Sequence, residues 1–377
     1  MLEVLALLCV TLSLLNGKNL WEKISQISGN FLMASGLLAI GTLFSILFND
    51  QWRLGFGILK GWFFIPMFFS FCLYAVIDSP AYARKIFQSL YFSTVAVGTI
   101  SLVYKIAGIV TYDDRLSGFY ASPNYLAMYL APGIFFGFYF LYESYQKNKF
   151  SKKSFAHIIA LGILSTSLYF TYSYGTWMAT LAAMAIVLTY NLKTKKYLFF
   201  SLMLLILATT ILFFSQVGTQ KFADILHFSQ RSSIASRVMI WKASFLLIKN
   251  NPIFGIGPGN FQQSYLAVQP SFPPYLEWAV PQPHNLFLAF WLQTGFVGLL
   301  GFLWILFFVF KSLFHIFKNK KDAALAAPLL GFFLYTMLHG LIDTPYWKND
   351  LAFLFWICVF LVLFLYNSSQ PKNSSAQ

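Results

Sequence analysis

The chain has 377 residues, of which 58% are hydrophobic, 20% aromatic and only 10% charged, and its mean hydropathy is +0.65. A soluble domain carries roughly 25% charged residues, so this composition excludes a water-soluble globular protein. The formal net charge of +14 does not call for a nucleic-acid partner, because a membrane protein with basic inner loops accounts for it.

Apolar segments follow one another along the whole chain, and each is continuously apolar rather than alternating, which predicts helices and not strands. Eleven such segments occupy residues 2–16, 31–48, 60–77, 86–110, 125–144, 155–172, 176–192, 197–214, 285–310, 323–342 and 351–366. The first is short but lacks a small-residue cleavage site, so we expect a spanning helix rather than a signal peptide. The predicted fold class is an all-α polytopic integral membrane protein with about eleven transmembrane helices.

The basic residues predict the orientation. Threading the segments alternately puts 16 of the 26 Lys and Arg on one side, which is therefore predicted to be cytoplasmic. The other side holds ten, five of them in one long loop where the rule hardly applies. The three cysteines, Cys9, Cys72 and Cys358, lie in apolar segments and suggest neither a disulfide nor a metal site.

The same threading divides the chain into four parts. They are N-terminal transmembrane helices (about eight), a large periplasmic loop, C-terminal transmembrane helices (about three) and a disordered-looking cytoplasmic tail, at residues 1–214, 215–284, 285–366 and 367–377. The loop is the only long one, and long loops in compact folds are usually functional.

One amphipathic helix is predicted inside this loop. Ser233 or Ser236 can cap it, and it should run to about Asn250, where Pro252 and several glycines break it. One face of this helix carries the apolar residues Val238, Trp241, Phe245 and Ile248. We expect it to lie on the membrane surface as a cap.

Polar residues gather in the segments predicted to face outward. Arginines there suit a diphosphate, because the planar guanidinium binds two oxygens and does not lose its proton. The candidates are Arg115, Arg231 and Arg237. Snorkelling to the surface is the alternative for each of them, and Arg237 is favoured because Trp241 follows one helical turn later.

His284 opens the apolar stretch PHNLFLAFWLQTGFVG at residues 283–298. At about 3.6 residues per turn, a continuous helix would place His284, Gly295 and Gly298 on one face. The glycines would let a neighbouring helix approach closely in lipid. A helix N-terminus disfavours positive charge, so we expect a neutral imidazole that is available as a base at the membrane surface.

These motifs resemble those of the O-antigen ligase and polymerase superfamily, bacterial enzymes that use polyprenyl-diphosphate-linked sugars. The ligase hallmark is His, then Asn, Ser or Gln, nine residues, Gly, two residues, and Gly, Thr or Tyr, and residues 284–298 satisfy every position. SRVMIWKASFLLIKNNPIFGIGPGNF is similar to the family's Arg-x-x-x-Trp helix and Pro-x-x-Gly-x-Gly turn. RLSGFYASPNYLA is similar to its earlier outer loop, and the resemblance spans roughly residues 110–360.

The resemblance implies a GT-C-like membrane glycosyltransferase at the periplasmic face of the bacterial inner membrane. The donor would be an undecaprenyl-diphosphate-linked glycan, and the acceptor a sugar hydroxyl on lipid A–core or another glycan, with no cofactor. His284 would act as general base, and Arg237, with Arg115 or Arg231, would neutralise the departing diphosphate. Further candidates for contacts with the diphosphate or acceptor are Asn285, Trp241, Tyr174, His339 and Asp343.

Two features depart from the family pattern. Members often carry Ser-Arg-Gly where this chain has Ser173-Tyr174-Gly175, so an arginine thought to help hold the diphosphate is absent. Arg115 or Arg231 would have to substitute, or the donor is held differently. Members also commonly show one more span than is visible here.

The aspartates of two outer segments allow other interpretations. Asp113 and Asp114 could bind a divalent cation, but the resemblance calls for no metal and Arg115 follows at once, so we expect a local salt-bridged turn. His339 and Asp343 are four residues apart, as on one helical face. They could orient each other or the acceptor, or form an internal structural pair.

Three alternatives to a ligase stay open. A polymerase or a protein O-oligosaccharyltransferase of the same superfamily would carry similar residues, and the complete ligase-type His motif favours the ligase. A glycan or lipid transporter without chemistry belongs to another class. Transporters tend to show inverted repeats and mid-membrane charges, whereas the ionisable groups here gather at one face.

Overall fold

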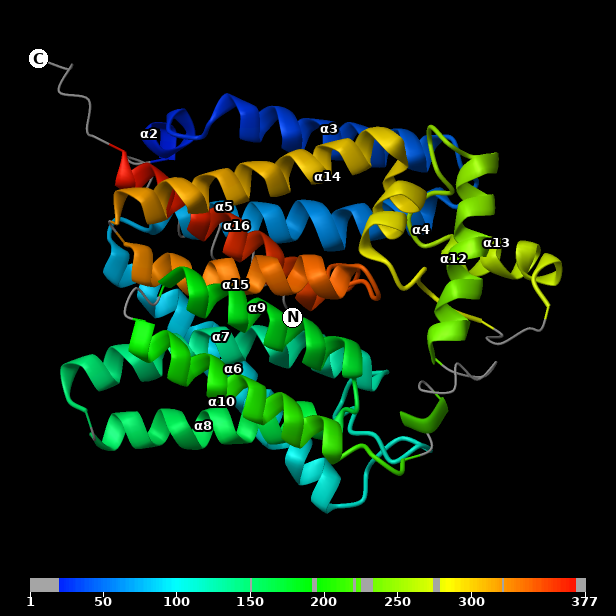
Figure 1. Ribbon diagram of the computed structural model, residues 1–377. Helices are drawn as coiled ribbons and strands as arrows, with labels where there is room; N and C mark the ends of the chain where they lie inside the picture. The colour runs from blue at the N-terminus through cyan, green and yellow to red at the C-terminus, as the bar shows by residue number, and fades with distance from the viewer. Residues whose placement is uncertain are drawn as a thin grey trace, which may run out of the picture. The chain divides into compact units, whose positions relative to one another are not determined.

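The computed structural model describes residues 20–149, 151–191, 195–219, 222–224, 233–273, 279–320 and 322–370. All regular secondary structure in these residues is helical, as the apolar segments predicted (Figure 1). Predictions for the first apolar segment, 2–16, and for Arg231 lie outside the described residues.

Eight helical spans in the described residues are long and apolar enough to cross a membrane. They are α3 (Gly29–Leu47), the run of α4, η1 and α5 (Trp52–Val76), α6 (Pro80–Ile106), α7 (Pro123–Lys147), α8 (Lys152–Phe170), α14 (Leu286–Asn319), α15 (Ala323–Gly340) and α16 (Asn349–Ser369). Two shorter apolar stretches lie in α9 (Tyr174–Asn191) and α10 (Lys195–Phe214). The chain is therefore a polytopic helical membrane protein, and the residues that the structure describes hold eight such spans, not the predicted eleven.

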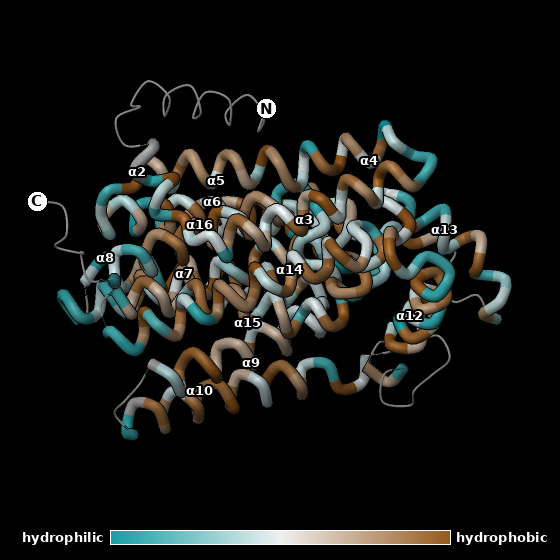
Figure 2. Tube along the Cα trace, turned by 90° about the horizontal axis from the view of Figure 1, so that it is seen from above, coloured by the Kyte–Doolittle hydropathy of each residue, from teal (hydrophilic) through white to brown (hydrophobic). Residues whose placement is uncertain are grey.

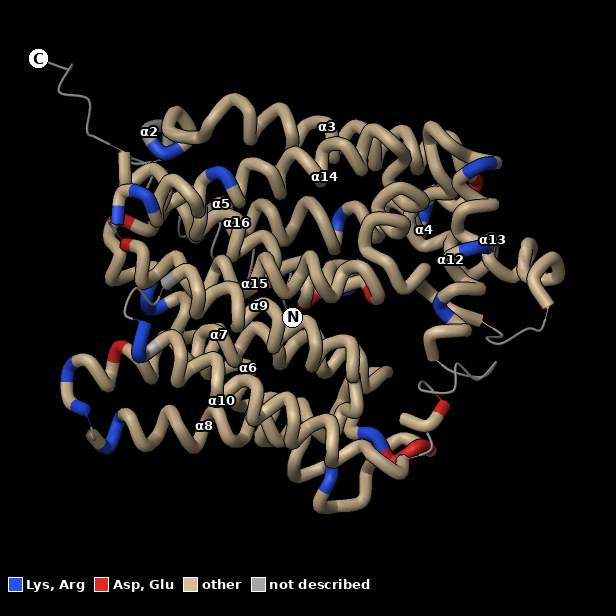
Figure 3. Tube along the Cα trace, in the orientation of Figure 1, with Lys and Arg blue, Asp and Glu red and all other residues tan. Residues whose placement is uncertain are grey.

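Polarity follows the helix ends. The long helices are mostly apolar along their length, with hydrophilic residues near their ends (Figure 2). Most charged residues likewise lie at or beyond helix ends (Figure 3). A bilayer core of about 30 Å explains this pattern, because a charged side chain within it is costly.

The chain forms two compact units, each assembled from separate stretches of sequence. Unit 1 comprises Met1–Val76, Ile206–Lys311 and Gly340–Phe360, and unit 2 comprises Ile77–Leu205, Ser312–His339 and Leu361–Gln377. The long segment 215–284 therefore belongs to unit 1, whereas α6, α7 and α8 belong to unit 2.

In unit 1, α12 (Ser233–Asn250) runs across the ends of α3 and α14, and α13 (Phe261–Val268) and the short η2 (Gln269–Ser271) follow it (Figure 1). The bounds of α12 confirm the helix predicted from the sequence. Two residues of the predicted apolar face, Val238 and Phe245, are exposed on the protein surface. The residues that α12 buries against α13 and the first turns of α14 are instead Met239, Ile240, Ala243, Leu247 and Ile248.

Unit 2 is built around α6, α7 and α8, which pack on one another. Ser122 caps α7 by accepting a hydrogen bond from the N–H of Asn124, and Ser151 caps α8 in the same way through Ser154. At the other end of α7 from Ser122, Arg84 of α6 forms an ion pair of 2.7 Å with Glu143. The ion pair thereby ties α6 to the C-terminal part of α7.

Candidate active site

The segment between α15 and α16 carries the buried carboxylate of Asp343, whose side chain is 4% exposed. Its Oδ1 accepts a hydrogen bond from the N–H of Thr344 at 2.9 Å. Nδ1 of His284 lies 3.1 Å from the same oxygen, and Nη2 of Arg237 lies 3.8 Å from Oδ2. Asp343 therefore joins an imidazole and a guanidinium, all within unit 1.

The contact with Asp343 assigns the proton on His284. A carboxylate oxygen can only accept, so Nδ1 is the donor in this contact, and in the neutral form of the ring this leaves the lone pair on Nε2. The backbone of His284 has φ of 48°, a left-handed conformation that residues other than glycine rarely adopt. Its carbonyl oxygen accepts a hydrogen bond from Nε1 of Trp241 at 3.1 Å. The imidazole is thus held at both backbone and ring, yet remains 26% exposed.

Asn285 supports this arrangement with both ends of its amide. Its Oδ1 accepts hydrogen bonds from the N–H groups of Phe287 and Leu288, each at 3.0 Å, which caps the first turn of α14. Its Nδ2 donates to the carbonyl of Leu341 at 2.9 Å and so ties this turn to the segment that carries Asp343. In the His284-Asn285 pair of the sequence motif, His284 therefore contacts Asp343, and Asn285 holds the backbone around it in place.

Arg237 projects from the first turns of α12. Its Nε donates to the carbonyl of Ile342 at 2.8 Å, and its Nη1 donates to the carbonyl of Ser233 at 3.2 Å. These bonds use two of five N–H groups, so the guanidinium has further capacity for an anion. Because its side chain is 21% exposed, an anion from outside can reach it beside His284.

The segment that carries Asp343 is anchored on η1 (Leu59–Phe64), a π-helix between α4 (Trp52–Ile58) and α5 (Ile65–Val76). The hydroxyl of Tyr346 donates to the carbonyl of Trp62 at 2.7 Å, and Nδ2 of Asn349 donates to the carbonyl of Gly61 at 2.8 Å. Burial raises the pKa of Tyr346, so its hydroxyl stays protonated as this donor. Sequence reasoning missed this support, because nothing in LKGWFF distinguishes a π-helix from an α-helix. π-Helical turns are frequent at functional sites.

A kink interrupts α14 at Gly295, whose φ of 70° and ψ of 176° are not helical. The helix also begins at Leu286, after His284. The prediction that His284, Gly295 and Gly298 share one face of a continuous helix is therefore wrong. A Cβ atom at Gly295 would lie 2.6 Å from the carbonyl oxygen of Ile253, so the position requires glycine for both conformation and space.

The turn after α12 fills the break in α14. The N–H of Ile256 donates to the carbonyl of Leu292 at 2.6 Å, and the N–H of Phe296 donates to the carbonyl of Ile253 at 2.9 Å. A broken helix in or near a membrane needs such partners for its freed backbone groups. The Pro-x-x-Gly-x-Gly turn and Gly295, two separate motifs in the sequence, are thus one structural unit.

Gly298 lies after the kink and meets α3. A Cβ atom at Gly41 of α3 would clash with the backbone nitrogen of Gly298. The two helices therefore approach at backbone distance, as small residues permit in lipid.

Arg115 lies in unit 2, and its guanidinium holds the protein's own backbone and side chains. Its Nε donates to the carbonyl of Thr171 at 2.8 Å, its Nη2 donates to Oδ1 of Asn124 at 2.7 Å, and its Nη1 lies 3.9 Å from Asp113. The ion pair with Asp113 is the local salt-bridged turn expected from the sequence. Tyr172, the residue after Thr171, has a left-handed backbone with φ of 46°. Burial raises the pKa of the Tyr172 hydroxyl, and the neighbouring Tyr169 and Asp114 raise it further by smaller amounts.

Tyr174 and His339 also lie in unit 2. Tyr174 begins α9, and its ring centroid lies 5.2 Å from that of Trp177. His339 is buried, with Nε2 3.3 Å from the Thr176 hydroxyl and its ring stacked on Tyr335. Because α15 ends at Gly340, His339 and Asp343 do not share a helical face, and that prediction is wrong.

Comparison with known proteins supports one family. Residues 159–303 match the family model described as O-antigen ligase. The matched stretch includes α12, the turn that follows it, His284, Asn285 and both motif glycines, but not Arg115 or Asp343. No curated protein matches the chain.

Proposed function

We propose that this chain, whose residues 159–303 match the O-antigen ligase family model, is an O-antigen ligase-type glycosyltransferase. The donor is a glycan carried on undecaprenyl diphosphate, and the acceptor is a hydroxyl of lipid A–core or another glycan. The reaction takes place at the periplasmic face of the bacterial inner membrane. The observation that carries this choice of site is the contact of His284 and Arg237 with the one carboxylate of Asp343.

His284 is the general base of the proposed reaction. The acceptor oxygen attacks the anomeric carbon of the donor glycan, and its proton passes to Nε2 of His284. The imidazolium that forms keeps its Nδ1–H on Asp343, whose negative charge stabilises it. Asp343 is thus a positioning residue that acts through His284.

Arg237 stabilises the leaving group. The bond between the anomeric carbon and the diphosphate oxygen breaks, and its electron pair stays on the diphosphate. The remaining N–H groups of Arg237 bind this growing negative charge, which can stabilise a transition state by roughly 3 kcal/mol for one well-placed donor. The proposal requires neither a metal ion nor a nucleotide sugar, because the diphosphate is already an activated leaving group.

Cells that lack the gene test this proposal when they are complemented with variants. We expect His284→Ala to restore no surface glycan and to leave long glycans on the lipid carrier. His315→Ala is the matched control, because His315 lies in unit 2 and contacts Asn319 and Gln370. Single repeat units on the carrier would point to a polymerase, and normal surface glycan with His284→Ala would overturn the assignment of the base.

A further inference from the structure

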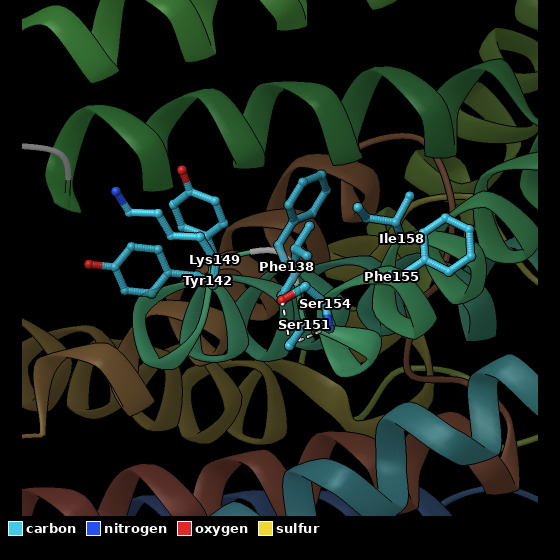
Figure 4. Close-up of a pocket in the computed structure, with 9 residues that line it drawn as sticks. Phe138, Tyr142, Lys149, Ser151, Ser154, Phe155 and Ile158 are labelled. Carbon is cyan, nitrogen blue, oxygen red and sulfur yellow. Dashed lines mark hydrogen bonds between the residues drawn. The ribbon is translucent and has the colours of Figure 1, made fainter.

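An elongated groove runs along the hairpin of α7 and α8 in unit 2 (Figure 4). Its volume of about 430 Å³ lies within the usual range of ligand pockets, roughly 300–1,000 Å³. Its lining includes Phe138, Tyr142, Lys149, Ser151, Phe155 and Ile158.

The walls of the groove are suited to hydrocarbon. Phe138 and Tyr142 come from α7, and Phe155 and Ile158 come from α8, two helices that are both long and apolar enough to span a membrane. Tyr142, Phe155 and Ile158 are 53%, 65% and 54% exposed, so they turn outward from unit 2. An apolar groove on the outer side of two spanning helices suits hydrocarbon chains better than water.

One end of the groove is basic. Lys149 lies at this end, while Phe155 and Ile158 lie toward the other (Figure 4). Lys152 and Lys153 follow in the same turn and are exposed. The nearby carboxylate of Glu143 is already paired with Arg84 and with Lys147 at 2.8 Å, so it does not cancel the charge of Lys149.

The end beside Lys149 also offers polar groups that suit a phosphate. Ser151 accepts a hydrogen bond from the N–H of Ser154 at 3.1 Å and so caps α8, whose N-terminus carries a partial positive charge. Ser151 lines the groove itself. Cation, hydroxyl and apolar walls are thus arranged in the order of a phospholipid's phosphate, glycerol and acyl chain.

We propose that this groove binds an anionic glycerophospholipid, with one acyl chain between α7 and α8 and the phosphate at Lys149. The lipid belongs to the leaflet on the Lys-rich side, which the distribution of basic residues predicts to be cytoplasmic. The site is independent of glycosyl transfer and of the groups around Asp343. It would hold the α7–α8 hairpin at a fixed depth in the bilayer.

Native mass spectrometry of the full-length protein with added palmitoyl-oleoyl phosphatidylglycerol or phosphatidylcholine tests the proposal. We expect the wild type to retain phosphatidylglycerol preferentially, and Lys149→Gln to lose roughly five-fold in that affinity with phosphatidylcholine binding unchanged. Lys195→Gln is the matched control, because Lys195 is also an exposed lysine at a helix end in unit 2 but does not line the groove.

A second variant tests binding of the lipid's acyl chain separately from binding of its headgroup. Ile158→Trp fills the apolar half of the groove and should reduce binding of both lipids, while circular dichroism reports that the helices are intact. Equal binding of the two lipids by the wild type would overturn the proposal, because the groove would then hold hydrocarbon without recognising an anion. Equal losses for Lys149→Gln and Lys195→Gln would also overturn it, since surface charge alone would explain the binding.

Discussion

Arg237 in unit 1 and Arg115 in unit 2 are both candidates from the sequence for holding the diphosphate, but they have different surroundings in the structure. The guanidinium of Arg237 stands beside a buried carboxylate that also holds His284. Both guanidiniums also donate to backbone carbonyls, but the carboxylate near Arg115, that of Asp113, is 40% exposed and accepts a hydrogen bond from the Thr111 hydroxyl. The first arrangement suits chemistry on a bound anion, and the second suits the fixing of a turn. The burial and the other partners of the neighbouring carboxylate therefore distinguish the two arginines.

Among the groups around the proposed base, the largest effect should come from Asp343→Asn, which removes the negative charge that both His284 and Arg237 contact. An amide in this position permits the wrong tautomer of His284, and the corresponding change in a serine protease triad costs about 10⁴-fold in rate. We expect a loss of roughly 10²- to 10⁴-fold in transfer and a changed pH–rate profile, measured with purified protein and lipid-linked donor. Asp113→Asn, next to Arg115, is the control and should stay within about two-fold of wild type.

Alanine at the two arginines tests the contrast directly. Arg237→Ala should lower transfer by roughly 10²- to 10³-fold at saturating donor, because it removes a donor to the leaving group. Arg115→Ala should instead destabilise unit 2 by about 1–3 kcal/mol, through lost charge-assisted hydrogen bonds to Thr171 and Asn124. Transfer rates and thermal unfolding together distinguish the two outcomes. An Arg115→Ala protein that unfolds normally but transfers as poorly as Arg237→Ala would remove the contrast.

A smaller effect is expected from Gly295→Ala, which tests whether the kink supports the site. The new Cβ would be strained at φ of 70° and would meet the carbonyl oxygen of Ile253 at 2.6 Å. We expect a destabilisation of about 1–3 kcal/mol and reduced transfer, measured by thermal unfolding and by donor turnover. Gly162→Ala in α8 of unit 2 should leave transfer unchanged and should not lower stability, because no atom lies within 4 Å of the position that its new methyl group would take and alanine favours a helix over glycine.

The smallest effect should follow Tyr346→Phe. The variant removes the hydrogen bond to the carbonyl of Trp62 and leaves Nε1 of Trp356 without its acceptor, at a cost of about 1–3 kcal/mol. Transfer should fall only several-fold, because the segment of Asp343 loosens without losing a catalytic group. Tyr112→Phe, in the fully exposed part of the Arg115 loop, should change nothing. A Tyr346→Phe protein with normal stability would show that η1 does not anchor this segment.

Sequence could predict the helical class and the bounds of α12, because long apolar runs and a capped amphipathic stretch are local signals. It also singled out His284, Arg237 and Asp343. It did not pair them correctly, since Asp343 was matched with the nearby His339 although its partner His284 lies 59 residues away in the chain. Spacing along one helix says nothing about such a contact.

The orientation of helix faces was the other gap. In a membrane protein both the lipid-facing and the buried surfaces are apolar. The spacing of apolar residues along α12 therefore could not predict that Met239 and Ala243 are buried while Val238 and Phe245 are exposed. The kink at Gly295 depends on backbone groups supplied by residues 253–256, which are far away in sequence. A straight helix was therefore the simplest expectation from the motif spacing alone.

The most direct test of the proposed mechanism is the single-turnover transfer rate of His284→Gln, measured with the lipid-linked donor bound to saturation. The mechanism predicts a rate roughly 10²- to 10⁴-fold below that of wild type, with the affinity for the donor unchanged, because only proton transfer from the acceptor is lost. A His284→Gln protein that transfers glycan within about two-fold of the wild-type rate would contradict it.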